Sequence, residues 1–471
     1  MMDVVIAWFR NDLRLHDNPA LYHAAHSGAA VLPIYIDETT TKPWPPGATS
    51  RWWLHHSLQA LDDALKERGN RLHLFQGDAQ QILSELIKAT GAGAVYANRR
   101  YEPENEAIDL AIHRALQQGQ IPFHNYDANL LHPPEAILNQ QGQPYKVFTP
   151  YYKASLARGI DTHTRSAPES IPAYGKAVKS IKLEALQLLP KLHWDSGFYE
   201  HWTPGEAGAQ KRLQSFIDES LPYYPQQRDI PSIDGTSRLS PHLHFGEISP
   251  REFVARLRKD KHPSVDAVIR QLIWRDFAHT VLHHFPHTTV QPFNQKFKNF
   301  PWNKNGNKKL TAWQQGQTGI PIVDAGMREL WHTGYMHNRV RMIVGSFLTK
   351  NLLLHWHHGA KWFWDTLVDA DLAHNSMNWQ WIAGCGVDAA PYFRIFNPVS
   401  QGEKFDANGD YVRYWVPELA GLDNKWLHRP WEASSEALEK AGIKLGIDYP
   451  KPIVDLKLSR QQALESYQRI K

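Results

Sequence analysis

The hydrophobic pattern of the first 130 residues alternates short apolar runs, rich in β-branched side chains, with longer amphipathic stretches. Apolar runs at 4–9, 31–36, 71–76, 94–99 and 122–127 predict strands. Amphipathic stretches near 18–27, 50–68, 78–90 and 103–119 predict helices between them. Strands separated by helices of this length are typical of βαβ crossovers, so the pattern predicts an α/β N-terminal domain with a doubly wound, Rossmann-like parallel sheet. No GxGxxG or P-loop motif follows the first strand, so a standard NAD or ATP site is not supported.

The pattern changes twice along the rest of the chain. From about 131 to 203 the periodicity is lost and prolines recur, which predicts a connector. After Pro204 helical periodicity dominates, with expected helices at 205–221, 250–259, 264–284, 321–333, 336–353 and 359–368. We therefore expect three parts: an α/β domain over 1–130, a connector over 131–203 and an all-α domain over 204–471.

Composition is that of a globular protein, with 42% hydrophobic and 21% charged residues. The N-terminus reaches charged residues too early for a signal peptide, and no apolar run is long enough to span a membrane, so we expect a cytoplasmic protein. The single cysteine, Cys385, excludes an internal disulfide. The net charge of +4 is uneven: residues 1–130 hold 11 Lys and Arg against 15 Asp and Glu, whereas the remainder holds 41 against 33. The basic excess of the second part favours a polyanionic partner only weakly.

Tryptophan and histidine are both abundant. Twelve of the 18 tryptophans lie from Trp274 onward, where aromatic planes could stack on bases or a flavin or simply fill the core. The 26 histidines show no metal-binding spacing such as HExxH, so no metal site is expected. We interpret His355, His357 and His358 as a solvated helix end.

Three segments carry candidate chemistry. The first, GTSRLSPHLHFGEISP at 235–250, gathers Ser and Thr hydroxyls and a guanidinium around a predicted helix start. Such groups suit a phosphate, but taken alone the segment favours the interpretation as an ordinary capped helix. The second, VIRQLIWRDF, would place Gln271, Trp274 and Arg275 on one helix face by their i, i+3, i+4 spacing. The same spacing groups Asn338, Arg341 and Met342.

The third segment, VDADLAHNSMNWQWIAGCG, is the most informative. On a helix, Asp371, Asn375 and Trp379 would form one row, and Met377 and Trp381 a second row rotated away from it. One row could face a cofactor and the other a substrate. Each residue also has a structural interpretation, with Asp371 as a helix-start carboxylate and both tryptophans as core.

These motifs together resemble the photolyase and cryptochrome family. WFRNDLRLHDNPAL, YYPQQRDIPSIDGTSRLSPHLHFGEISPRE, TGIPIVDAGMRELWHTGYMHNRVRMI and DADLAHNSMNWQWIAGCG occur in the family's order, from residue 3 to about 450. The resemblance is strongest to bacterial class I cyclobutane pyrimidine dimer photolyases. It implies a monomeric enzyme that binds UV-damaged DNA and repairs the dimer in blue light, using reduced FAD held in the helical domain.

The resemblance also assigns residues. The positions that match the family's FAD contacts are Tyr224, Thr236, Ser237, Arg238, Leu239, Ser240, Trp274, Arg275, Asn338, Arg341, Asp369, Asp371 and Asn375. The positions that match lesion and DNA contacts are Arg228, Gln271, Trp274, Asn338, Arg339, Met342, Trp381 and Arg394. The electron-transfer chain of the family matches Trp379, Trp356 and Trp302, and Trp302 is offset by one residue from some relatives.

Some features leave alternatives open. Many dimer photolyases have glutamate where this chain has Gln271, and glutamine there occurs in (6-4) photoproduct photolyases. Those relatives, however, carry a histidine where this chain has Asn338, so the dimer is the expected substrate. Asn375 favours a repair enzyme over a cryptochrome-type blue-light sensor, because plant cryptochromes typically have an acid there. The antenna, a folate or a deazaflavin, stays open, since the Asn-Glu pair that binds folate in relatives reads Glu104-Asn105 here.

Overall fold

The computed structural model describes residues 3–38, 44–389 and 394–471. Its chain forms two compact units, each assembled from segments far apart in sequence. The first, here called the sheet unit, comprises Met1–His193, Trp202–Pro222 and Ser237–Pro286. The second, the helical unit, comprises Trp194–His201, Tyr223–Thr236 and His287–Lys471.

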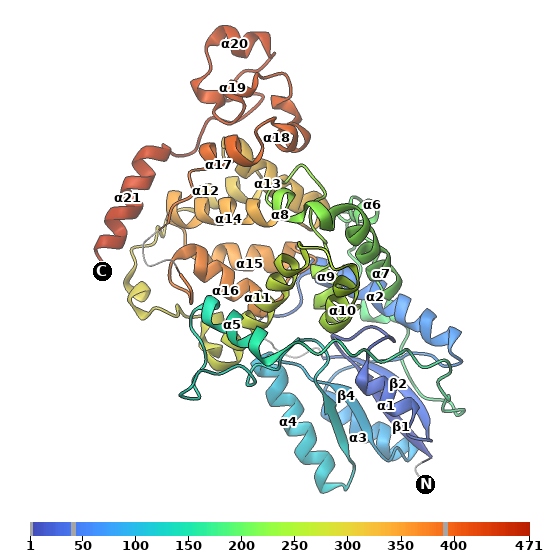
Figure 1. Cartoon of the computed structure of the whole chain (residues 1–471). Coiled ribbons are helices and arrows are strands. Elements are labelled where there is room, and N and C mark those ends of the chain that lie inside the picture. The colour runs from blue at the N-terminus through green and yellow to red at the C-terminus, as the bar shows by residue number, and fades with distance from the viewer. Residues whose placement is uncertain (1–2, 39–43, 390–393) are drawn as a thin grey trace. The chain divides into compact units, whose positions relative to one another are not determined.

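The sheet unit is built on five parallel strands in the order β3-β2-β1-β4-β5 (Figure 1). The strands are β1 Val4–Phe9, β2 Ala30–Asp37, β3 His73–Gln76, β4 Val95–Asn98 and β5 Phe123–Tyr126. Strand β1 lies at the centre, pairing Ile6 with Leu32 on one side and with Val95 on the other. All six residues of β1 are buried, as a strand covered on both faces requires. The predicted doubly wound parallel sheet is confirmed.

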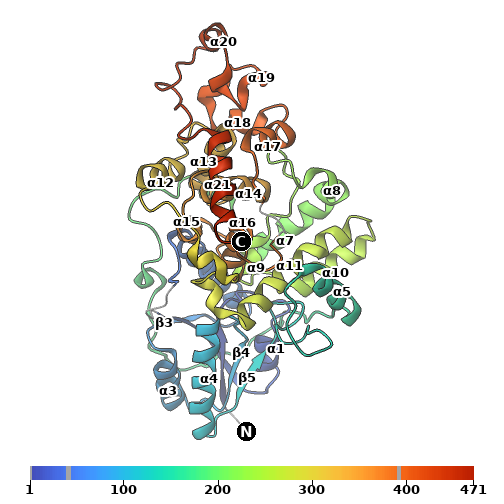
Figure 2. The ribbon, with the colours of Figure 1, turned by 90° about the vertical axis from the view of Figure 1, so that its left-hand side faces the viewer.

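Helices alternate with these strands. They are α1 Pro19–Ala25, α2 Ala48–Glu67, α3 Ala79–Thr90 and α4 Pro103–Gln118. Figure 2 shows α3 and α4 beside the strands, where Leu83 of α3 and Ile112 of α4 join the apolar core that surrounds Ile6. Local signals set the ends of α3, because Asp78 caps its first turn and Gly91 ends it in the left-handed conformation.

The remaining helices of the sheet unit lie within the predicted connector or after it. They are α5 Phe148–Arg158, α7 Glu206–Ser215, α9 Ser240–His244, α10 Pro250–Asp260 and α11 Val265–His284. Helix α7 continues as a π-helix over Phe216–Ser220. Helix α5 lies in the segment 131–203, where the loss of periodicity predicted no helix. Its two aromatic pairs, Phe148 with Trp274 and Tyr151 with Phe277, pack it against α11, so tertiary contacts stabilise a helix whose own pattern is weak.

The helical unit contains no strand among its described residues. Its helices are α6 Phe198–His201, α8 Tyr224–Gln227, α12 Asn307–Gln314, α13 Pro321–Thr333, α14 Asn338–Ser346, α15 Trp356–Thr366, α16 Leu372–Ala383, α17 Pro398–Phe405, α18 Asp410–Trp415, α19 Asn424–Leu427, α20 Ser435–Lys440 and α21 Leu456–Gln468. Helix α14 continues as a π-helix, η6 Phe347–Asn351. The predicted all-α second part is confirmed. Within the described ranges no helix combines the length and apolarity needed to cross a bilayer.

Candidate functional site

Helix α14 presents the first group of predicted residues. Asn338 opens the helix and is exposed, whereas Arg341 and Met342, one turn later, are half-buried. The Arg341 guanidinium donates from Nε to the Met336 carbonyl at 2.7 Å and from Nη2 to Asp369 at 3.0 Å. Burial alone would lower the pKa of Arg341, but the Asp369 carboxylate, together with Tyr335 and Glu329, outweighs it and raises that pKa. The pair is therefore a fixed, fully charged element.

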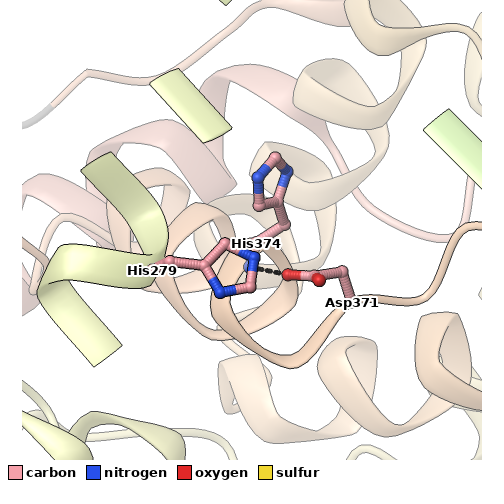
Figure 3. A group of neighbouring side chains, drawn as sticks. All are labelled: His279, Asp371 and His374. Carbon is pink, nitrogen blue, oxygen red and sulfur yellow. Dashed lines mark hydrogen bonds between the residues drawn. The ribbon is translucent and has the colours of Figure 1, made fainter. Parts of the chain in front are cut away.

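Helix α16 begins at the acid that the sequence singled out. Asp371 is its N-cap and accepts a hydrogen bond from the His374 backbone N–H at 2.9 Å (Figure 3). The structural interpretation of Asp371 as a helix-start carboxylate is therefore confirmed. One turn later, the Asn375 side chain donates from Nδ2 to the Ala360 carbonyl at 2.9 Å. This bond ties the amide to α15 and orients its other end, the acceptor oxygen.

Trp379 lies two turns beyond the N-cap and is 4% exposed. Its indole packs edge-on against Phe363, with ring centroids 5.0 Å apart, and against Gly359 of α15. The second row is placed differently: Met377 is buried, whereas Trp381 is half-buried and donates from Nε1 to the Asp388 carbonyl at 3.0 Å. Each of the two rows predicted from the spacing thus combines buried and half-buried side chains, so burial does not distinguish them.

The other two predicted electron-transfer residues also lie in the helical unit. Trp356 is the first residue of α15 and is 1% exposed. Trp302 is half-buried and packs on Phe300 with ring centroids 4.3 Å apart. The prediction of a solvated helix end at 355–358 is wrong for two of its three residues. His355 and His357 are half-buried against aromatic rings at the start of α15, and only His358 is exposed.

The predicted DNA-contacting arginines have unequal surroundings. Arg228 lies over the ring of Tyr224 at 5.2 Å, and Tyr224 itself is buried in α8. Arg339 forms an ion pair with Asp229 at 2.9 Å and turns away from the Arg341 side of α14, as its helix position predicts. Arg394 is exposed.

Lys350, which holds the segment of Arg394, carries no motif that would single it out from the sequence. Its ammonium lies in the π-helix η6, 1% exposed, and donates to the Arg394 carbonyl at 2.6 Å. Burial lowers the pKa of Lys350 to about 7. The π-helix that contains Lys350 is a form enriched at functional positions, but it cannot be recognised from helical periodicity in the sequence.

The serine-rich turn adopts a tight local structure. Arg238 has a left-handed backbone with φ of 49°, Leu239 is fully buried, and the exposed Ser240 begins α9. The Ser237 carbonyl accepts from Arg212 Nε at 2.8 Å, which fixes this part of the turn. Thr236, half-buried, precedes it.

The three α11 residues predicted to share one polar face are not alike. Trp274 stacks on Phe148 at 3.6 Å, and Gln271 donates to the Ala267 carbonyl at 3.3 Å; both are half-buried. Arg275 is buried and donates to the carbonyls of Leu243, at 3.2 Å, and of Asn129. All three residues lie on helix α11, as their spacing predicts. The Arg275 guanidinium, however, binds backbone carbonyls of other segments, and helical spacing cannot predict such partners.

A second polar group lies where β1 and β4 end. Arg10 donates to both carboxylate oxygens of Asp109 at 2.8 Å, and Arg100 binds the same carboxylate at 2.5 Å. Burial opposes ionisation of Asp109, but the two guanidiniums lower its pKa overall. Ligands of doubly wound sheets bind at this edge, where the strand order reverses. Asn105 of the Glu104-Asn105 pair bonds Glu102 at 2.9 Å.

Two family profiles cover most of the chain. Residues 5–172 match the family described as DNA photolyase, and residues 268–469 match the FAD binding domain of DNA photolyase. A deoxyribodipyrimidine photo-lyase of Agrobacterium fabrum is 47% identical over 99% of this chain and 98% of its own length. The chain belongs to the DNA photolyase family. Its FAD-binding domain is thereby established.

Other members of the photolyase family are similar over nearly the whole chain. A crystal structure of a bacterial class III photolyase from Agrobacterium tumefaciens superposes with a TM-score of 0.96 at 46% identity, covering 100% of this chain and 98% of that one. The sequence motifs suggest class I, whereas this similar structure is described as class III. Cryptochrome-2 of Arabidopsis thaliana is 38% identical over 98% of this chain and 78% of its own length.

The residues present fit an FAD. The helical unit offers a half-buried ion pair, Arg341 with Asp369, and the anchored Asn375 amide. The turn at 236–240 offers hydroxyls and a guanidinium of the kind that bind a diphosphate. A flavin dinucleotide needs cationic and hydroxyl groups for its phosphates and an amide for its ring system, and the chain supplies groups of each kind.

Proposed function

We propose that this chain is a deoxyribodipyrimidine photo-lyase that splits cyclobutane pyrimidine dimers in DNA under blue light. The observation that carries the proposal is the anchored amide of Asn375, held by the Ala360 carbonyl one turn after the Asp371 cap. Family members that repair DNA have an amide at this place. A neutral amide can hydrogen-bond a reduced, anionic flavin without adding a second negative charge.

The proposed FAD contacts are the thirteen residues from Tyr224 to Asn375 that match the family. FAD, when bound, supplies the excited-state electron that splits the two ring bonds of the dimer. The chain's own residues bind and orient it: the hydroxyls and Arg238 of the 236–240 turn suit the phosphates, and the pair of Arg341 and Asp369 supplies a fixed charge.

The chain's aromatic and basic side chains would hold the lesion. Trp274 and Trp381, both half-buried, offer indole faces for the flipped bases, and such stacking is worth about 1–3 kcal/mol per base. Arg228, Arg339 and Arg394 would bind phosphates beside it. Arg339 would exchange part of its contact with Asp229 for DNA. Arg394 is exposed, and its backbone carbonyl accepts a hydrogen bond from Lys350.

The substrate assignment depends on Gln271, Asn338 and Met342. Asn338 is exposed and Met342 half-buried at the N-terminal end of α14, so both present side chains at the helix surface. Neither can act as the proton-transferring histidine of (6-4) enzymes. Gln271, half-buried in α11, offers the lesion an uncharged amide.

The proposed division of labour is the one that the sequence pattern predicts. Residues 1–130 would carry the antenna, a folate or a deazaflavin, residues 131–203 would connect, and residues 204–471 would bind FAD and DNA. The match of the FAD-binding profile to 268–469 supports the last assignment. We also propose that the protein is cytoplasmic and monomeric. Size-exclusion chromatography with light scattering would test whether it is a monomer.

The deciding experiment uses a DNA oligonucleotide with one thymine cyclobutane dimer and chemically reduced protein. Repair in blue light and none in darkness is the expected result. Flavin-loaded protein that leaves the dimer intact in light would refute the proposal. The same assay with a (6-4) oligonucleotide would then separate a (6-4) enzyme from a cryptochrome-type sensor.

A further inference from the structure

An imidazole links two of the tryptophans in the helical unit. The ring of His355 lies 5.2 Å from Trp302 at an interplanar angle of 69°, and 5.5 Å from Trp356 at 27°. On its other side, Trp356 contacts His357, with ring centroids 3.9 Å apart. The half-buried Trp302 and the fully buried Trp356 therefore flank one histidine ring.

The backbone holds this arrangement in place. The Asn303 N–H donates to the Leu353 carbonyl at 2.7 Å, which joins the Trp302 segment to the turn before α15. Leu353 has a left-handed backbone with φ of 53°, rare for a leucine, so the turn is specified by its surroundings. Gly306 packs directly on Leu354, where a side chain would collide.

The charge of His355 is set by its role as a helix cap. Its Nδ1 accepts a hydrogen bond from the His357 backbone N–H at 3.2 Å, and only an unprotonated nitrogen can accept. The helix N-terminus itself disfavours a cation. Burial, with His357 and His358 nearby, lowers the pKa of His355 to about 4. The ring is therefore neutral at physiological pH.

We propose that His355 is a positioning residue of photoreduction, a neutral spacer that seats Trp302 beside Trp356 and keeps positive charge out of the electron path. The proposal rests on the proposed chain of Trp379, Trp356 and Trp302. It also accounts for Trp302, whose place in that chain the sequence left least secure.

The electron balance shows why neutrality matters. Light drives an electron from Trp379 to an oxidised flavin, the acceptor, and Trp356 refills Trp379. Trp302 then gives an electron to oxidised Trp356, so the positive charge moves from Trp356 to Trp302, and a thiol reductant in solution refills Trp302. Both positions of the charge adjoin the His355 ring, so a cationic imidazole would destabilise both.

The test compares neutral and charged substitutions. His355→Asn keeps a good N-cap and neutrality, whereas His355→Lys places a cation between the indoles. The readout is the yield of long-lived oxidised tryptophan, measured by transient absorption. We expect this yield to stay within about threefold of the wild type for Asn and to fall at least about tenfold for Lys. At an effective dielectric constant near 20, the repulsion between two like charges about 5 Å apart is large enough to change an equilibrium constant by more than about tenfold. The matched control is His358→Lys, which adds the same charge to the exposed side of the same helix. It should lower the yield much less than His355→Lys, because solvent and salt screen an exposed charge.

Two further measurements separate the possible failures. Trp356→Phe should abolish photoreduction; wild-type photoreduction in that variant would refute the proposed chain, and the role of His355 with it. Blocked photoreduction in Trp356→Phe but a wild-type yield in a folded His355→Lys would overturn the role of His355 alone. Titration of the His355 ring by NMR in the flavin-free wild-type chain, assigned through His355→Asn, needs neither cofactor nor light. An ordinary titration near pH 6.5 would also overturn the proposal.

Discussion

The close contact between Gly359 of α15 and Trp379 of α16 predicts that a side chain at position 359 would displace the indole. A Cβ added at Gly359 would lie 2.5 Å from Trp379 Cζ2 and closer still to Cη2. Carbon atoms pack at about 3.5–4.0 Å. In Gly359→Ala the indole must therefore move by at least about 1 Å, or α15 and α16 must separate.

The cost follows from two opposing effects. Overpacking of a buried contact costs about 1–3 kcal/mol, whereas replacing a helical glycine with alanine gains up to about 1 kcal/mol. We expect a net loss of about 0–2 kcal/mol in the free energy of unfolding. Photoreduction should fall because Trp379 is displaced, while repair by chemically reduced enzyme should be spared.

Gly345 of α14 offers a matched control at the same indole. Its added Cβ would lie 3.5 Å from Trp379 Cζ3 and 3.3 Å from Ile382 Cγ2, which needs an adjustment of only a few tenths of an ångström. Gly345→Ala should therefore keep both stability and photoreduction. Urea unfolding and steady-state photoreduction of both variants test this. Equal photoreduction in the two variants would refute the close contact between α15 and α16.

Three other predictions concern the lesion, the DNA and the fold. Gln271→Glu should preserve or raise the quantum yield of thymine-dimer repair, because a carboxylate serves this role in many relatives; a large loss would show that the amide has its own role. Arg394→Ala should weaken lesion binding and reduce the slope of log K against log salt by about one, measured by fluorescence anisotropy, if it contacts one phosphate; an unchanged slope would remove Arg394 from the interface. Burial raises the pKa of Asp324 from 3.8 to about 6, so the folded state binds more protons than the unfolded chain between these values, and its stability falls as pH rises through that window. Relative to Asp324→Asn, the wild type should lose about 3 kcal/mol of unfolding free energy between pH 4 and 7, and parallel pH profiles would contradict this.

Patterns of period 2 and 3.6 predicted most of the fold because the main elements bury continuous apolar faces. The β1 strand is buried throughout, and α3 carries both an Asp cap and a terminal glycine, so its ends were readable. Helix α5 was not, because its apolar side is made of aromatic residues whose partners lie more than a hundred residues away on α11. The π-helix extensions of α7 and α14 could not be predicted either. A π-turn shifts the register of the helical side chains, but the amino-acid composition does not reveal it.

For the candidate site, the sequence predicted the side of a helix on which a residue lies but not the partner of its side chain. Spacing placed Arg341 on a different side of α14 from Arg339, and the structure agrees, yet nothing in the sequence says that Arg341 pairs with Asp369 and Arg339 with Asp229. Helical spacing reports direction along one helix only. The partner of a charged group is decided by a second element, which enters through the fold.

Arg275 and His355 are two residues whose proposed roles depend on partners from other parts of the chain. Arg275 matches a cofactor contact, but its guanidinium binds the Leu243 and Asn129 carbonyls, so it also fixes the chain around α11. Any loss of flavin in Arg275→Ala would therefore mix a lost contact with a loosened fold, and flavin content alone would not assign its role. The sequence predicts a solvated helix end at His355 because three histidines within four residues are typical of a polar surface. The role proposed for its ring depends on two neighbours, Trp302 and Trp356, that the tertiary structure brings to it. Residues whose function is to position other residues are therefore the ones that sequence motifs miss, and charge substitutions with matched exposed controls are the way to find them.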